Sequence, residues 1–341
     1  MACRNWLTLL GAAVLVALPA AAQRATKPIH EPWDVLEAKI RAEGDVKLKG
    51  VRELEASENG RDVIFRQEVI RDTDGRLRVE YTDPPGHRGV LFVSDGVVRW
   101  RYYPGERIAF REELPLAAEQ KAERIKAMRA LRDNLLLALQ DGGTVAGRPT
   151  WLLTMISRDA NAVLRQYWVD RKTLVELKKE SYLPGGKPTQ REWFVTIDYG
   201  PALVGNEFTW HPPRNVRVLE LEQPLLELPL QQARQRVEFE IYNPPRTALP
   251  PGFELIADKV AVFEEEETKV AWLRFTNGID ILSLFERKRP AFSGPPRHDA
   301  VTVEWTAGAL HFTLVGRVRP TDANKLRAVT VQALGPGGLA R

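Results

Sequence analysis

The chain has almost no cysteine, no long apolar run beyond its first residues, and no region dominated by one sign of charge. Cys3 is the single cysteine among 341 residues, which excludes a disulfide framework and a cysteine-rich metal site. The 49 lysines and arginines are interspersed with 45 aspartates and glutamates, so the net charge of +4 does not form the basic face of a nucleic-acid binder. The composition is that of a globular protein with two domains.

Residue patterns that usually carry catalysis or metal binding are also absent. The five histidines share no helical spacing of four residues and no paired motif, so no zinc site is predicted. The sequence has no G-x-S-x-G nucleophile elbow, no phosphate-binding P-loop and no dinucleotide-binding glycine motif. We therefore predict a protein that is not an enzyme and that holds no metal and no cofactor.

The first 22 residues have the order of a secretory signal peptide. Arg4 precedes an apolar run from Trp6 to Leu18, and Pro19 and three alanines follow it. This order predicts cleavage before Gln23, because the run of 13 residues is shorter than the roughly 20 that a membrane span needs. Cys3 precedes the apolar run, so it is not the acylated cysteine of a lipoprotein. The expected product is periplasmic, soluble and not membrane-spanning after signal cleavage.

Alternating apolar residues predict an antiparallel sheet in the first half of the mature chain. A short amphipathic helix is expected over 33–42, and a longer one over 116–140, where leucines recur at steps of three and four. Short turns with Asn-Gly, Asp-Gly or Pro-Pro-Gly separate the first strands. The strands are expected at 62–71, 76–82, 90–93, 97–103, 150–156, 163–169, 174–179 and 191–199.

Eight prolines between residues 212 and 251 mark a linker and the irregular start of a second unit. A helix near 321–329 is expected to close this unit. Its strands are expected near Val237–Ile241, 270–275, 279–285, 301–305 and 310–315. The predicted division is a signal peptide at 1–22, a first domain at 23–215, a linker at 216–236, a second domain at 237–334 and a tail at 335–341.

A long meander with few helices buries one face well only if the sheet curls around those helices. Large side chains on the concave face then tend to line a cavity that suits an acyl chain or an apolar peptide. The candidate lining residues are Val63, Phe65, Val79, Tyr81, Leu91, Val93, Trp100, Tyr102, Leu131, Leu135 and Tyr167. The same residues could instead form a dry core, which is the commoner fate of such side chains, and the sequence does not distinguish the two. The basic residues at 121–132 are either a solvated helix face or a patch for an acidic partner.

Several segments resemble the periplasmic LolA/LolB-like superfamily and, within it, the RseB/MucB family. DGVVRW at 95–100, followed by YYP, resembles a strand pair of the superfamily, and YWVDRKTL at 167–174 resembles its next hairpin. LPPGF at 249–253, FTNGI at 275–279 and TLVGRV at 313–318 resemble successive parts of the RseB/MucB C-terminal domain. The resemblance covers about residues 33–332, with Asn277 in place of the usual aspartate and with a linker richer in proline.

The resemblance implies an α+β fold: a LolA-like antiparallel half-barrel with covering helices, followed by a small α+β C-terminal domain. RseB/MucB-like proteins bind an anti-sigma factor, shield it from proteolysis, and release it when lipid or misassembled envelope material is sensed. The implied partners are the periplasmic segment of an inner-membrane anti-sigma factor and a lipid or lipoprotein acyl chain, with no nucleic acid. The alternatives are a periplasmic lipid or lipoprotein carrier of the LolA type and a purely structural envelope protein. No partner-contact residue carries over.

Overall fold

The structure is a computed structural model. It describes residues 31–58, 61–73, 75–114, 118–119, 121–122, 124–125, 132, 134–158, 161–183, 186, 188–221, 226–265, 267–277, 279–288 and 301–335. The predicted signal peptide at 1–22, the candidate residue Leu131 and all but the first residue of the predicted tail lie outside the described residues.

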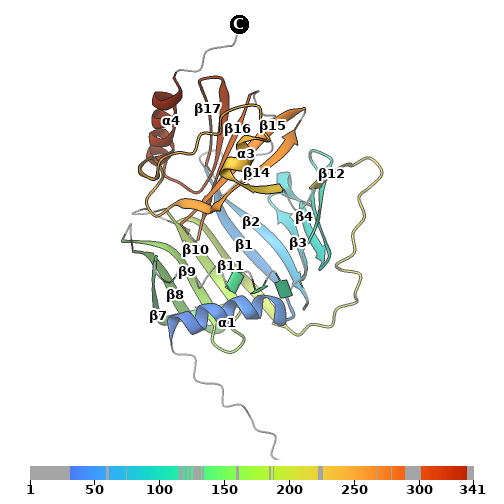
Figure 1. The fold of residues 1–341 in the computed structure, drawn as a ribbon. Helices are drawn as coiled ribbons and strands as arrows, with labels where there is room; N and C mark the ends of the chain where they lie inside the picture. The colour runs from blue at the N-terminus through green and yellow to red at the C-terminus, as the bar shows by residue number, and fades with distance from the viewer. Residues whose placement is uncertain are drawn as a thin grey trace, which may run out of the picture.

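Twelve strands form one open sheet, and helix α1 (Pro32–Asp45) crosses it (Figure 1). Neighbouring strands are antiparallel except at one edge, where β12 runs parallel to β6. In space the order is β12-β6-β5-β4-β3-β2-β1-β11-β10-β9-β8-β7. The strands are β1 (Leu48–Glu58), β2 (Arg61–Arg71), β3 (Arg76–Asp83), β4 (Leu91–Asp95), β5 (Val98–Tyr103), β6 (Ile108–Glu113), β7 (Leu135–Val145), β8 (Arg148–Ser157), β9 (Ala162–Asp170), β10 (Glu176–Tyr182), β11 (Pro188–Tyr199) and β12 (Arg217–Leu221).

Alternation along the strands decides which face of this sheet is buried. In β2, Phe65, Gln67 and Val69 are buried, whereas the residues between them are exposed. Side chains alternate between the two faces of a strand, so the buried set of β2 shares one face. We call this the concave face, because the curled sheet and α1 enclose it. Val35 and Leu36 of α1 pack there against the apolar residues of β7, β8 and β9.

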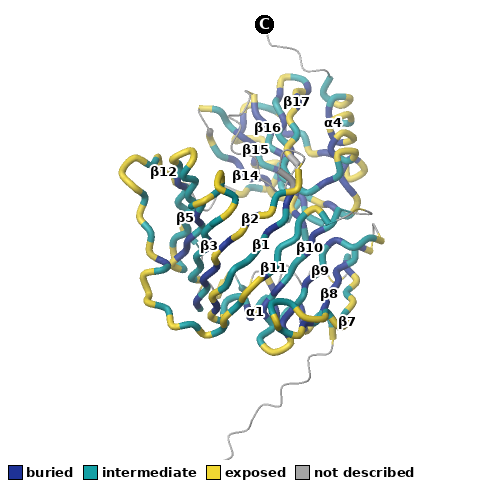
Figure 2. The backbone as a smooth tube through the Cα atoms, turned by 180° about the vertical axis from the view of Figure 1, so that it is seen from behind, coloured by how far each residue is buried: buried dark blue, intermediate teal, exposed yellow. Residues whose placement is uncertain are grey.

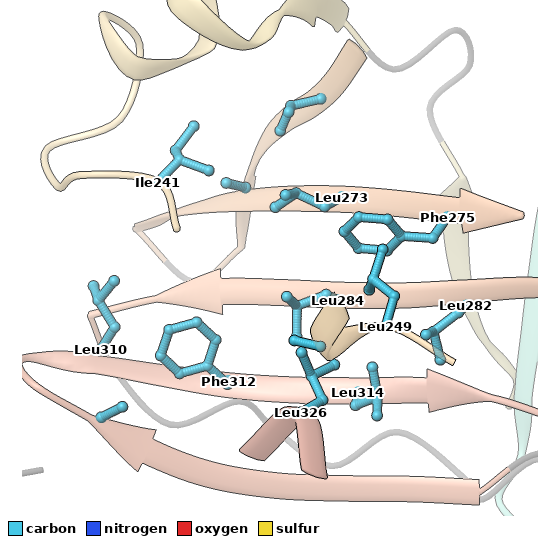
Figure 3. Packing of buried hydrophobic residues seen from close by; sticks show 14 of the residues in the cluster. Ile241, Leu249, Leu273, Phe275, Leu282, Leu284, Leu310, Phe312, Leu314 and Leu326 are labelled. Atoms are coloured by element: carbon cyan, nitrogen blue, oxygen red, sulfur yellow. The ribbon is translucent and has the colours of Figure 1, made fainter. Parts of the chain in front are cut away.

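The second unit is a six-stranded sheet with helices packed on one face. Its order is β13-β14-β15-β16-β18-β17, and all its neighbours are antiparallel. Buried leucines and phenylalanines from the sheet meet Leu326 of the last helix in one apolar core (Figure 3). The elements are β13 (Leu226–Pro229), α3 (Leu230–Arg234), β14 (Glu254–Glu265), β15 (Thr268–Thr276), β16 (Ile281–Arg287), β17 (Val301–Ala307), β18 (Leu310–Gly316) and α4 (Pro320–Leu334).

Two expected elements are corrected by the structure. The helix expected to run to Gln140 gives way to β7 at Leu135, because leucines four residues apart satisfy the period of two as well as that of a helix. The strand expected at Val237–Ile241 is an irregular segment, although Val237 and Ile241 are buried in the second core. The predicted linker at 216–236 contains β12 of the first sheet and β13 and α3 of the second unit.

The two units meet through a buried ionic contact. Asp280, just before β16, accepts a hydrogen bond from Arg165 of β9 at 2.8 Å. Arg317, just after β18, lies 3.8 Å from the same carboxylate and also donates to Thr189 of β11 at 2.6 Å. The expected fold class is confirmed: an α+β protein with an open half-barrel followed by a smaller α+β unit.

Candidate functional site

A cavity of about 450 Å³ lies on the concave face, beside the C-terminal part of α1. This volume falls within the range of roughly 300–1,000 Å³ that small-molecule sites occupy. Its apolar lining comes from α1, four strands of the sheet and the chain after β6. These apolar residues are Ile40, Leu48, Val69, Leu77, Val79, Leu114, Ala118 and Phe194. Its charged lining is Glu43, Asp45, Arg52, Arg71, Arg76, Arg99, Lys121, Arg124 and Glu176.

A network of buried ion pairs adjoins this cavity. Lys39 of α1 is only 5% exposed and lies 2.6 Å from both Glu43 and Glu176. Its ammonium also sits 4.5 Å from the centre of the Tyr167 ring. Lys179 of β10 pairs with Glu192 of β11, so the network crosses from the helix to the centre of the sheet.

The electrostatics of this network keep its members charged. Burial alone would lower the pKa of Lys39, but the carboxylates of Glu176 and Glu43 outweigh it and raise the pKa above its ordinary value. Burial likewise opposes ionisation of Glu192, whereas Arg52 and Lys179 beside it lower its pKa to about 2. The centre of the concave face is therefore ionic at neutral pH.

Arg71, at the end of β2, lines the cavity and forms no ion pair with any described residue. Its Nε donates to the carbonyl oxygen of Val46 at 3.3 Å, and its Nη2 is buried without a hydrogen-bond partner among the described residues. Burial lowers the pKa of Arg71, and the nearby carboxylate of Glu43 opposes that effect. A buried guanidinium nitrogen without an acceptor is costly, since burial removes its water without replacing the hydrogen bond.

Six of the predicted cavity residues lie on the concave face, but only one of these six lines the cavity. Val79 lines it directly, next to Val69 of β2. Val63, Phe65 and Tyr81 belong to a small apolar cluster around Leu54. The remaining two, Leu135 and Tyr167, pack beneath α1 in the cluster that contains Val35 and Leu36.

The other described candidates lie on the opposite, convex face. Val79 is opposite Phe92 in the register of β3 and β4, so Leu91 and Val93 point the other way. Val93 is opposite Trp100 and Leu91 is opposite Tyr102, which places these two aromatic residues on the convex face as well. The correction follows from register, which one sequence does not reveal.

A segment after β11 covers these convex-face residues. Trp210 packs against Trp100 and Tyr102 with ring centroids 5.3 and 5.1 Å apart. Figure 2 shows the chain at 200–216 running along the outside of the sheet towards β12, with much of it exposed. Trp100 and Tyr102 therefore belong to an outer aromatic cluster and not to the cavity.

Arg52 and Lys179 on the concave face were missed because charges interrupt the apolar alternation of their strands. Strand β1 reads LKGVRELEASE and β10 reads ELKKESY, so charges occupy both faces of each. Such sequences are typical of strands that are exposed to solvent. Only the positions of β1 and β10 in the middle of the sheet turn Arg52 and Lys179 inward.

The described residues contain no group of three or more histidine, cysteine, aspartate or glutamate side chains that could hold a metal ion. Within the described part of the chain, no helix is both long and apolar enough to cross a membrane.

Comparison with solved structures relates the whole two-unit arrangement to MucB. The structure of the Pseudomonas aeruginosa MucA/MucB complex matches with a TM-score of 0.57 and 20% identity, covering 86% of this chain and 96% of that one. MucB in complex with MucA(peri) and MucB alone each match with a TM-score of 0.51, at 18% and 19% identity. Each of these two covers 87% of this chain, with 97% and 96% of the other chain covered.

No family model and no curated protein sequence matches this chain. The likeness to MucB is therefore one of fold, and it extends through both units. The resemblance to the RseB/MucB family indicated by the sequence motifs is confirmed at the level of the fold.

Proposed function

We propose that this chain is a periplasmic, non-enzymatic regulator of envelope-stress sigma-factor signalling. In this role it binds the periplasmic segment of an inner-membrane anti-sigma factor and senses lipid or lipoprotein in the cavity of the concave face. The supporting observation is the fold shared across both units with MucB, which has been solved in complex with MucA. The second unit would be the main protein-contact module and the half-barrel the ligand-sensing one.

The chemistry of the concave face supports a regulator over an acyl-chain carrier of the LolA type. A carrier gains affinity from a continuous apolar surface, since each buried methylene contributes about 0.8 kcal/mol. Here ion pairs of Lys39, Lys179 and Glu192 interrupt that surface at its centre. The remaining cavity is confined to one side and is partly charged. It is better suited to recognising one ligand than to holding several acyl chains.

Binding to the protein partner tests the proposal directly. The exported chain, purified from a periplasm, is mixed with the soluble segment of a single-span protein encoded in the adjacent reading frame, and binding is measured by calorimetry. We expect a saturable complex. A chain that forms no complex but transfers acylated cargo between vesicles would establish the carrier alternative.

Two matched charge reversals would show which unit contacts the protein partner. Arg274 of β15 pairs with Glu227 and lies over the Trp272 ring, whereas Arg66 of β2 pairs with Glu53 on the first sheet. We expect Arg274→Glu to weaken partner binding about tenfold, or 1.4 kcal/mol. Arg66→Glu should leave it unchanged. The opposite ranking would move the contact to the half-barrel.

A further inference from the structure

An open groove of about 580 Å³ lies on the convex face of the first sheet, away from α1. Lys179 and Glu192 point towards the concave face, so Lys178 and Trp193, one position away in the same strands, point outwards. The register places Lys178 opposite Trp193 in β11 and opposite Trp168 in β9. A row of an indole, an ammonium and a second indole therefore crosses three neighbouring strands at the floor of this groove.

The charged residues of the groove neutralise one another. Lys178 lies 2.8 Å from Glu180, and Arg191 lies 2.9 Å from Glu55 and 3.6 Å from Glu180. The two basic and two acidic side chains that line the groove give it no net charge. An ionic ligand would have to break one of these pairs, whereas a hydroxyl group, which both donates and accepts, can hydrogen-bond to either partner and leave the pair in place.

The two indoles supply apolar surface at a defined spacing. Trp168 and Trp193 are both half-buried, and neither indole N–H has a hydrogen-bond partner among the described residues. The Lys178 ammonium lies 4.1 Å from the centre of the Trp168 ring. Adjacent strands are 4.7–4.9 Å apart, so side chains on β9 and β11 are separated by about 10 Å. The groove thus alternates aromatic and polar groups along a line perpendicular to the strands.

The hairpin between β7 and β8 forms one wall of the groove, at residues 144–146. A bulge between Asp141 and Thr144 bends this hairpin, and a side chain at Gly142 would meet the Thr150 hydroxyl at 2.5 Å. Asp141 accepts the backbone N–H of Gly143 at 2.7 Å. The wall is therefore held by local hydrogen bonding and close packing. Phe194, where the register of β1 and β11 shifts, borders both this groove and the cavity beside α1.

The position of the groove disfavours two common kinds of ligand. Strands β9, β10 and β11 each have a hydrogen-bonded neighbour on both sides, so an extended peptide cannot add to them as a strand. A long apolar chain would lie across Lys178 and Arg191, and its burial would remove water from their ion pairs. The remaining fit is to a ligand that is uncharged, rich in hydroxyl groups and apolar on its faces.

From this arrangement we propose that the convex groove binds an uncharged, extended, β-1,4-linked pyranose chain that runs across β9, β10 and β11. A pyranose ring presents C–H groups on its faces and hydroxyls at its rim, so it can pack on an indole while it hydrogen-bonds to charged side chains. In an extended β-1,4-linked chain every second ring has the same orientation, and this repeat matches the separation of Trp168 and Trp193. The inference goes beyond the proposed function and does not depend on it, because it concerns another face of the molecule.

Three oligosaccharides test the proposal on the unaltered exported chain. Calorimetry compares chitohexaose, which is extended and long enough to reach both indoles, with chitobiose, which is too short, and with maltohexaose, whose α-1,4 linkages curve the chain. We expect chitohexaose to bind about tenfold or more tightly than either of the others. No binding of chitohexaose would overturn the proposal. Equal affinity for chitobiose or for maltohexaose would also overturn it, because the spacing of the indoles would then play no part.

Variants identify the residues. Trp193→Ala and, independently, Trp168→Ala should each weaken chitohexaose binding about tenfold. Trp210→Ala is the matched control, since Trp210 packs on Trp100 and Tyr102 of the same face but outside the groove, and it should leave the affinity unchanged. Circular dichroism establishes that each variant is folded. Unchanged affinity in a folded Trp193→Ala or Trp168→Ala protein would contradict the assigned site.

Titration of the same variants with the protein partner separates this inference from the proposed function. We expect Trp193→Ala to bind the partner as the wild type does. A variant that loses the partner, in a protein that binds no oligosaccharide, would assign the groove to a protein contact and overturn the proposal. A wild-type chain that binds chitohexaose with the expected dependence on Trp193, but no partner, would retain the groove and lose the regulatory function.

Discussion

At the scale of single residues, this protein buries charges and pairs them. Lysine is rarely buried unless it is paired, and Lys39 meets that condition with two carboxylates and the face of an aromatic ring. Removing water from such ions is costly, and the cost is offset only while every partner is present. The network is therefore more sensitive to the loss of one member than to a change in overall charge.

Replacing Lys39 by methionine should test this sensitivity. The variant keeps an unbranched side chain but leaves Glu176 without its closest cation, and we expect the free energy of unfolding to fall by about 3 kcal/mol. Arg41→Met is the control, because Arg41 forms an exposed pair with Glu37 on the same helix. It should change stability by less than about 1 kcal/mol. Urea denaturation measures both. Equal midpoints would show that the Lys39 network contributes no net stability.

Glu286, in the core of the second unit, is a buried acid of a different kind. It is fully buried, and its Oε2 accepts the backbone N–H of Tyr242 at 2.9 Å. No described residue donates to its Oε1. Burial raises its pKa well above the ordinary value of 4.5, against the smaller opposite effect of the Tyr242 N–H. Over a range of pH above 4.5, the folded state therefore holds a proton that the unfolded state has already released.

Glu286→Gln should make the second unit less sensitive to pH. Below about pH 4.5 both states of the wild type are protonated at Glu286, so this residue does not change stability with pH there. Above that value the unfolded state ionises first, and stability falls as pH rises towards the folded-state pKa. Glutamine keeps the acceptor for Tyr242, so we expect a higher melting temperature than wild type at pH 8 and a difference that shrinks towards pH 4.5.

The control for this measurement is an exposed carboxylate of the same sheet. Glu304 of β17 is exposed, so Glu304→Gln should leave the pH profile of melting as it is in the wild type. A Glu286→Gln profile parallel to that of the wild type would mean that Glu286 titrates as it does in the unfolded chain.

At the scale of elements, the sequence was sufficient wherever one face of an element was apolar. Helix α1 and strands β2 to β5 appear close to their predicted positions, because their apolar residues recur with one period only. The long predicted helix was extended wrongly into β7, because Leu135 and Leu139 fit the period of a helix as well as that of a strand. Strand β1 was not predicted at all, because charges interrupt its apolar residues on both faces.

The candidate cavity could be predicted less well than the fold. Phe65 and Leu135 lie on the concave face, where they are fully buried core residues and do not line the cavity. Trp100 and Tyr102 were placed on the wrong face of the sheet. Alternation within one strand separates its two faces, but only the register with the neighbouring strand shows which face is concave. The arginines that line the cavity looked like ordinary surface residues until the sheet order turned them inward.

At the scale of the whole molecule, two connections between the units lie far apart on the first sheet. One is covalent: β12 ends at Leu221 on the edge of the first sheet, and β13 begins at Leu226 on the edge of the second. The other is the buried contact of Asp280 with Arg165 and Arg317, which reaches the first sheet at β9, near its other edge. Arg165 also donates to the Tyr167 hydroxyl at 3.4 Å, next to the Lys39 network.

Asp280→Ala should loosen the two units without unfolding either. It leaves two guanidinium groups at the contact without their carboxylate, and we expect two separate unfolding transitions where the wild type shows one. Faster cleavage between residues 216 and 236 under limited proteolysis should accompany the change. Asp322→Ala removes an aspartate that pairs with Arg319 within the second unit, so it controls for the loss of an ion pair as such. Identical behaviour of the two variants would locate the coupling elsewhere.

The two connections also set the stiffness of the half-barrel. An open sheet can flatten or curl, but here one unit joins the β12 edge to β9 and so braces the sheet across its width. Flattening the sheet would stretch the Asp280 contact, and separating the units would release the curvature. Because such coupling is reciprocal, a molecule wedged beside α1 and a protein held by the second unit would each change the shape that the other encounters.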